Sequence, residues 1–167
     1  MKLHLLAVLA ASTALSACSV FEKKAPTPAA EPACKQTTKE EIAALFDRWN
    51  NSLQTGDPKK VVENYAEDGI LLPTLSNKPR LTQAEKEDYF KHFLEKKPVG
   101  KIDMSHIQIG CNVAKDNGLY TFTFADGSSA PGRYTFTYRW DGNKWLISSH
   151  HSSLMPEKAT GAKGKKH

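Results

Sequence analysis

Apolar residues in the first half of the chain recur every three or four positions, which is the spacing of one face of an α-helix. The first such run follows Thr38, which forms a capping-box pattern with Glu41, and Gly56 marks its end. These features predict an amphipathic helix whose buried face consists of Ile42, Leu45, Phe46, Trp49 and Leu53.

Two further helices and a strand are predicted next. Asp57-Pro58 combines a capping side chain with a first-turn proline, so it begins a second helix. A capping box at Thr82 and Glu85 begins a third helix, and Pro98-Val99-Gly100 ends it. Between these helices, the apolar run from Gly69 to Leu75 predicts a short strand.

From Lys101 onward the apolar positions alternate with polar ones, which is typical of strands with one buried face. We predict four long strands in an antiparallel meander, with the last one running from Trp145 to Ser153. The turns between them are expected at Asp116-Asn117-Gly118, within Asp126 to Gly132, and at Asp141-Gly142-Asn143. Three helices followed by such a meander predict an α+β domain.

The N-terminal segment has the pattern of an export signal. Lys2 precedes an apolar run from Leu5 to Leu15, which is too short to remain as a membrane-spanning helix. Leu15-Ser16-Ala17-Cys18 resembles a bacterial lipobox, so we expect residues 1–17 to be a lipoprotein signal peptide and Cys18 to carry lipid. Ser19, in place of the aspartate that favours inner-membrane retention, predicts an envelope protein in the outer membrane that faces the periplasm.

The distribution of charge separates the domain from its flanks. The sequence carries a net charge of +5, but residues 38–156 hold 15 basic and 15 acidic side chains, so the excess lies in the ends. We expect residues 18–36 to be a Pro/Ala-rich linker, 37–157 to be the folded domain and 158–167 to be a basic disordered tail. A neutral domain excludes nucleic acid as the expected partner. The basic tail is suited either to contact anionic lipid or simply to aid solubility.

Two cysteines remain once Cys18 is lipidated. Cys34 and Cys111 are expected to form a disulfide in the oxidising periplasm, closing a loop of about 77 residues and stabilising the fold by roughly 4.5 kcal/mol at most. The alternative is that Cys111 is a small buried strand residue and Cys34 a free thiol in the linker.

Specific motifs resemble a known family over about residues 37–157. They are Trp49 with Gly56-Asp57, the run from Asp141 to Ile147, and His150-His151-Ser152-Ser153. These motifs and the order of elements resemble the association (hub) domain of calcium/calmodulin-dependent protein kinase II, within the cone-shaped nuclear transport factor 2-like superfamily. The resemblance implies a homodimer or larger homo-oligomer formed through the sheet and a pocket between helices and sheet that binds small anions through arginines. Kinase activity and calmodulin binding do not follow, because the chain has no kinase domain.

Four residues are candidates for binding a small-molecule ligand in that pocket. Arg133 begins a strand and could hold a carboxylate, or it could be a solvated arginine. His151, which by strict alternation shares a face with Ile147, matches the hub histidine, although the hub has an arginine where this chain has Ser152. A hydrogen-bonded structural histidine is the alternative. Tyr65 and Trp49 could form the apolar wall or be ordinary core residues.

Metal binding and catalysis find less support in the sequence. Adjacent residues on a strand point to opposite faces, so His150 and His151 cannot easily share an ion, and we expect neither a metal nor another cofactor. An isomerase would need a carboxylate base opposite an oxyanion-binding group, and no carboxylate lies inside a predicted alternating strand. A binding protein is therefore the preferred hypothesis. An isomerase, hydratase or cyclase of the same fold is the alternative.

Overall fold

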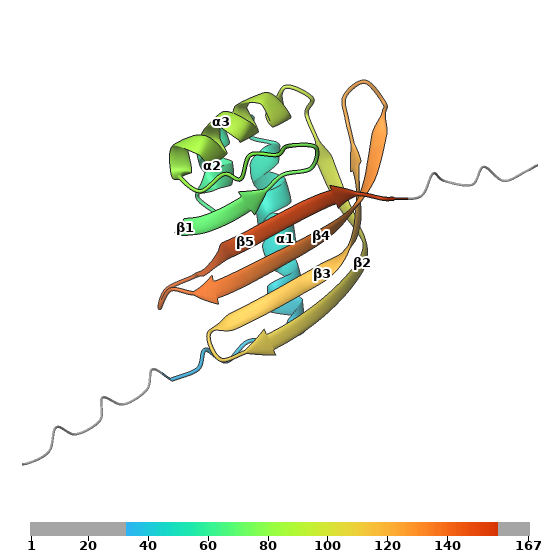
Figure 1. The fold of residues 1–167 in the computed structure, drawn as a ribbon. Coiled ribbons are helices and arrows are strands. Elements are labelled where there is room, and N and C mark those ends of the chain that lie inside the picture. The colour runs from blue at the N-terminus through green and yellow to red at the C-terminus, as the bar shows by residue number, and fades with distance from the viewer. Residues whose placement is uncertain (1–32, 157–167) are drawn as a thin grey trace, which may run out of the picture. The chain divides into compact units, whose positions relative to one another are not determined.

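A computed structural model describes residues 33–156, which form helices on one face of a single curved sheet (Figure 1). The sheet has the order β1-β5-β4-β3-β2, with β1 parallel to β5 and every other neighbouring pair antiparallel. The α+β prediction is confirmed. The elements are α1 (Lys39–Leu53), α2 (Pro58–Val62), β1 (Tyr65–Leu72), α3 (Gln83–Leu94), β2 (Val99–Gly110), β3 (Val113–Thr123), β4 (Ser129–Trp140) and β5 (Trp145–Leu154).

The helices begin where their capping residues predict. The Thr38 hydroxyl accepts a hydrogen bond from the Glu41 N–H at 3.2 Å, and the Glu41 carboxylate accepts one from the Thr38 N–H at 3.1 Å. Thr82 and Glu85 repeat this reciprocal pair at the start of α3. Each box satisfies backbone donors that the first turn leaves without an intrahelical partner.

The core lies between α1 and the sheet. Trp49 of α1 is 2% exposed, and its ring meets the edge of Phe136 on β4 at a centroid distance of 5.6 Å. Phe46 packs against the same Phe136 at 6.2 Å. Aromatic side chains supply both large buried area and specific edge-to-face contacts, so they fix how α1 lies across the strands.

The β2–β3 turn differs from its prediction. Residues 116–118 lie inside β3, and the chain turns instead after Gly110, where Asn112 adopts a left-handed φ of 57°. Gly118 serves close packing between strands, because a Cβ there would lie 1.8 Å from the carbonyl oxygen of Met104. Asparagine tolerates the left-handed conformation, which makes Asn112 suitable for the turn.

The first strand also differs from its predicted limits. It runs from Tyr65 to Leu72, not from Gly69 to Leu75, and its pairing with β5 is irregular between Tyr65 and Ile70. A Cβ on Gly69 would lie 2.6 Å from the carbonyl oxygen of Ile147 on β5. Gly69 therefore allows the two strands to approach closely and does not begin the strand.

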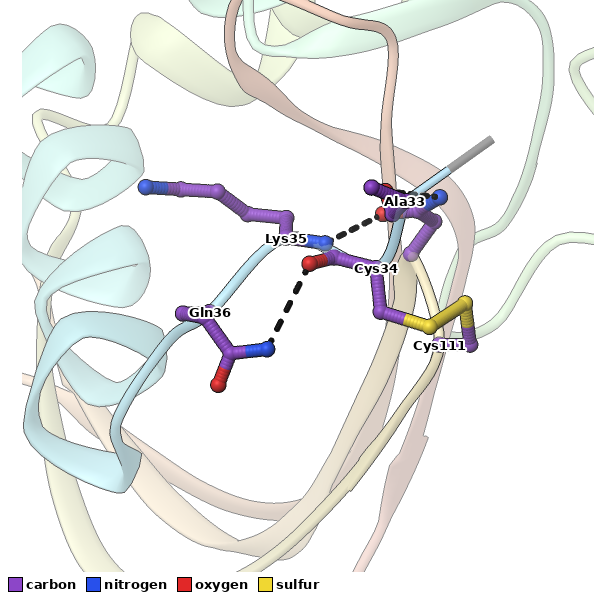
Figure 2. Close-up of a disulfide and its surroundings, with 6 residues drawn as sticks. Ala33, Cys34, Lys35, Gln36 and Cys111 are labelled. Carbon is purple, nitrogen blue, oxygen red and sulfur yellow. Dashed lines mark hydrogen bonds between the residues drawn. A yellow bond between two sulfur atoms is a disulfide. The ribbon is translucent and has the colours of Figure 1, made fainter. Parts of the chain in front are cut away.

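The predicted disulfide between Cys34 and Cys111 is present (Figure 2), with the two Cα atoms 4.8 Å apart. Asn112, next to Cys111, accepts a hydrogen bond on Oδ1 from the Lys35 N–H at 2.8 Å and donates one from Nδ2 to the Ala33 carbonyl at 3.4 Å. The start of the domain is thus attached to the β2–β3 turn by one covalent bond and two hydrogen bonds.

Several predictions concern residues outside the described range. The expected signal peptide at 1–17, the expected lipid on Cys18, residues 18–32 of the predicted 18–36 linker and the predicted 158–167 tail lie there. Within residues 33–156, no helix combines the length and apolar character that crossing a bilayer requires.

Candidate ligand-binding cavity

A cavity of about 530 Å³ lies between α3, the segment that follows β1, and the ends of β3, β4 and β5. Its wall is mainly apolar and aromatic, as is usual for small-molecule sites. The α3 side supplies Tyr89, Phe90 and Phe93, and the sheet side supplies Tyr120, Phe122 and Phe124.

The aromatic wall follows from the local sequence. Phe90 and Phe93 are three residues apart and therefore share one face of α3. Phe122 projects from the helix-facing side of β3, and its ring centroid lies 5.5 Å from that of Phe93 with the rings nearly perpendicular. These contacts hold α3 over the sheet, while the space between α3 and β5 remains open.

His150 of β5 is a buried polar residue on the cavity wall, with 4% of its surface exposed. Its Nδ1 lies 2.8 Å from the Tyr65 hydroxyl, and its ring stacks on Phe136 at 4.0 Å. Its Nε2 is buried and has no hydrogen-bond partner among residues 33–156. Burial, helped by the neighbouring His151, lowers the pKa of His150 to about 3, so the imidazole is neutral at physiological pH.

Three hydroxyl groups form a polar cluster next to His150. Ser152 Oγ lies 2.5 Å from Thr74 Oγ1 and also forms a short hydrogen bond with the Tyr120 hydroxyl. Burial raises the pKa of Tyr120 to about 12, so this phenol remains protonated. Hydroxyl groups both donate and accept, so this cluster can pair with either kind of ligand group.

Charged side chains occur only around the mouth, among the described residues that line the cavity. Arg80 lies over the Tyr89 ring at 5.8 Å, and Lys96 lies over the Phe124 ring at 5.9 Å. Asp88 and His92 are exposed at the same opening. The cavity thus changes from charged at its mouth to uncharged in its interior.

The structure brings together two of the four predicted ligand-binding residues. Trp49 lines the cavity, and Tyr65 is buried behind His150, to which it is hydrogen-bonded. Arg133 and His151 do not reach the cavity, because both are exposed on the sheet face that points away from the helices. Arg133 donates from Nε to the Ser153 hydroxyl at 3.2 Å.

A β-bulge explains why His150 replaces His151 on the wall. Ile147 pairs with Tyr138, but Ser149 pairs with Thr137, so β5 has one extra residue at Ser148. Such an insertion reverses the alternation of faces beyond it. The only hint in the sequence is the polar pair Ser148-Ser149, which interrupts the alternating pattern. The same reversal accounts for Ser152, which the sequence did not single out as a wall residue.

The expectation that no carboxylate lies inside a strand is wrong. Asp116 is in β3 and 1% exposed, and it accepts hydrogen bonds from the Ser105 hydroxyl at 2.6 Å and the Tyr134 hydroxyl at 3.1 Å. It was missed because its Asn-Gly neighbours suggested a turn. Asp116 does not line the cavity. Within residues 33–156, no three His, Cys, Asp or Glu side chains are grouped to hold a metal ion.

Sequence and structure comparisons identify the family. Residues 38–156 match the family described as calcium/calmodulin dependent protein kinase II association domain. A crystal structure from Xanthomonas campestris that is described as such an association domain is 47% identical in sequence and has a TM-score of 0.70. The match covers 74% of this chain and 91% of the Xanthomonas chain.

More distant structures share the fold. A nuclear transport factor 2-like protein with a cystatin-like fold from Novosphingobium aromaticivorans has 15% identity and a TM-score of 0.61, over 72% of this chain and 83% of its own. A nuclear transport factor 2-like superfamily protein from Salmonella enterica has 19% identity and a TM-score of 0.59, over 75% and 95%. No curated protein matches the sequence. The chain therefore belongs to the calcium/calmodulin-dependent protein kinase II association-domain family and has the nuclear transport factor 2-like cone fold.

Proposed function

We propose that this protein is an exported lipoprotein that oligomerises through its sheet and binds a small molecule with an apolar body in the cavity. The observation that carries the proposal is the aromatic cavity of about 530 Å³ with buried polar groups on one wall. Lipid on Cys18 attaches the protein to the outer membrane, where it faces the periplasm. The disulfide between Cys34 and Cys111 supports this location, since such bonds persist in oxidising compartments.

Binding is favoured over catalysis by the groups around the cavity. Asp88 is the sole carboxylate among the described lining residues, and it is exposed at the mouth. His150, with a pKa of about 3, is a poor general base near neutral pH, because an efficient base titrates near the working pH. Among the described residues, the isomerase, hydratase or cyclase alternative therefore lacks a suitable base in the cavity interior, since Asp88 and His92 lie exposed at the mouth.

Oligomerisation is proposed for the sheet face that points away from the helices. Small polar residues cover its centre, including Thr121, Thr135 and Thr137, and each is only partly exposed. A sheet face of this kind can pair with a second copy of itself about a two-fold axis. The name of the matched family, an association domain, agrees with this assignment.

Native mass spectrometry of the full chain, purified from bacterial membranes, tests these parts together. We expect a polypeptide that begins at a lipidated Cys18, a dimer or larger ring, and additional non-covalent mass that is lost on activation. The Cys18→Ala variant should retain its signal peptide and carry no lipid. An unprocessed wild-type chain would refute the anchor, and a bare monomer would refute both assembly and ligand.

A cavity-filling variant tests the location of binding. Ala130 is half-buried on the cavity wall, whereas Ala84 is exposed on α3 outside the cavity. The uncharged dye N-phenyl-1-naphthylamine should bind the wild type and Ala84→Trp equally, and Ala130→Trp should lose at least about tenfold in affinity, because the indole occupies the space. Equal binding by all three proteins would place the dye elsewhere.

A further inference from the structure

We propose that the inner end of the cavity binds an uncharged hydrogen-bond acceptor, a ketone, aldehyde or ester carbonyl on an apolar molecule, through the Nε2–H of His150. This rests on the proposed function, that the cavity binds a small molecule, and specifies which chemical class it takes. Three features of the site favour this ligand class: the position of the imidazole, the nitrogen that carries its proton, and the lack of a charged side chain beside it among residues 33–156.

The imidazole is held in one orientation. Phe136 stacks on one side of the ring at 4.0 Å, and Trp49 meets it edge-on at 5.4 Å. The Tyr65 hydroxyl at 2.8 Å occupies Nδ1. Because Nδ1 and Nε2 lie at different corners of the ring, Nε2 is the ring nitrogen left buried and without a hydrogen-bond partner among residues 33–156, on a residue that lines the cavity.

The proton of the imidazole can be assigned from its partner. Tyr65 Oη contacts no other side-chain or backbone acceptor among residues 33–156, so its hydrogen is satisfied only if it donates to Nδ1. A neutral imidazole carries one N–H, and that proton then resides on Nε2. The result is a buried donor without an acceptor, and such a donor is costly to leave unpaired. A ligand acceptor would satisfy it.

The surroundings select an uncharged acceptor. Arg80 and Lys96 lie at the mouth, and no other Lys or Arg of residues 33–156 lines the cavity. A carboxylate placed there would lose its hydration without gaining a cation, which is strongly unfavourable. A carbonyl oxygen loses far less hydration and gains the Nε2–H bond.

The hydroxyl cluster around Ser152 determines how the ligand is oriented in the cavity. Ser152 follows His150 by two residues on the same face of β5, a separation of roughly 6.6 Å along a strand. The opposite wall of α3 is apolar, with Phe90 and Phe93. The ligand should therefore lie with its polar edge along β5 and its apolar edge against α3.

A series of three probes on one naphthalene frame tests the class. The probes are the ketone 2-acetylnaphthalene, the hydrocarbon 2-ethylnaphthalene and the anion 2-naphthoate. Each probe is used to displace N-phenyl-1-naphthylamine from the full chain, and the Ala130→Trp variant measures binding outside the cavity. In His150→Phe, the preference for ketone over hydrocarbon should fall roughly fivefold to tenfold relative to the wild type. The anion should bind least well to the wild type.

Imidazole ¹⁵N NMR supplies a readout that does not depend on the variant folding. The ligand-free protein should show a protonated Nε2 and an unprotonated Nδ1 for His150, and 2-acetylnaphthalene should shift the Nε2–H proton downfield. The reverse tautomer, an unchanged ketone preference in His150→Phe, or a tighter naphthoate would each overturn this inference while the cavity still binds apolar probes. Failure of every probe and of the dye would instead overturn the proposed function.

Discussion

The two ends of the sheet are built on different principles. At the β2–β3 turn, the chain is crosslinked by Cys34–Cys111, Asn112 pairs with both Ala33 and Lys35, and the Trp140 N–H donates to the Asn112 carbonyl at 2.9 Å. At the opposite end, the strands border a cavity, and a buried ring nitrogen of His150 has no hydrogen-bond partner within the described part of the chain. Paired groups stabilise the first end, whereas the unpaired nitrogen at the second end gains a stabilising hydrogen bond only when a ligand binds.

The largest expected effect comes from removing the crosslink. Cys34→Ser/Cys111→Ser should lower the free energy of unfolding by up to about 4.5 kcal/mol, because the unfolded chain regains the entropy of a 77-residue loop. Urea unfolding at neutral pH measures this loss.

Dye binding at the cavity should be unchanged in the folded fraction of that variant. Reduced wild-type protein, as the control, should lose the same stability. A parallel loss of dye affinity would contradict the independence of the two ends.

The pH dependence of stability probes the cavity end. The pKa of His150 falls to about 3 in the folded state from an ordinary value near 6.5, so below pH 6.5 the unfolded chain binds a proton that the folded chain does not. Between pH 6.5 and 4.5, unfolding free energy should therefore decrease by up to about 1.4 kcal/mol per pH unit more in the wild type than in His150→Phe.

Urea unfolding at several pH values checks this difference in slope. The other histidines are common to both proteins, so their contributions cancel. Parallel slopes would mean that His150 is not buried as a neutral group.

The smallest expected effect is a difference in dye binding between variants of the two capping boxes. Thr82→Ala and Thr38→Ala should each cost about 1 kcal/mol of stability, because each removes one cap. Only Thr82→Ala should also weaken N-phenyl-1-naphthylamine binding, since α3 forms one wall of the cavity. Equal dye affinities in the two variants would show that the cavity tolerates a frayed α3.

Local chemistry made much of the fold predictable. Capping boxes, a first-turn proline and the apolar spacing of α1 depend on residues close in sequence, and the structure confirms them. The turn predicted at Asp116-Asn117-Gly118 was wrong because the same residues suit either a hairpin turn or a close contact between strands. Only the position of Met104 distinguishes the two.

The candidate site was harder to predict, because it depends on pairing between distant strands. The bulge at Ser148 is visible only once Ile147 and Ser149 are registered against β4. Without it, strict alternation assigns His151 to the cavity and His150 to the outside. The face occupied by Arg133 was hard to predict for another reason. The position of Arg133 in β4 does not reveal which sheet face the helices cover, and the helices all lie on one face (Figure 1), opposite to the exposed Arg133.

The position of the disulfide also has a mechanical consequence. Tension applied to the chain ahead of Cys34 passes through the sulfur–sulfur bond into Cys111 and the β2–β3 hairpin. The first turn of α1, five residues later, therefore does not have to resist the pull. Force applied from the N-terminal side therefore enters the sheet at the end opposite to the cavity. The cavity walls, at the far end of the strands, keep their shape under such a force.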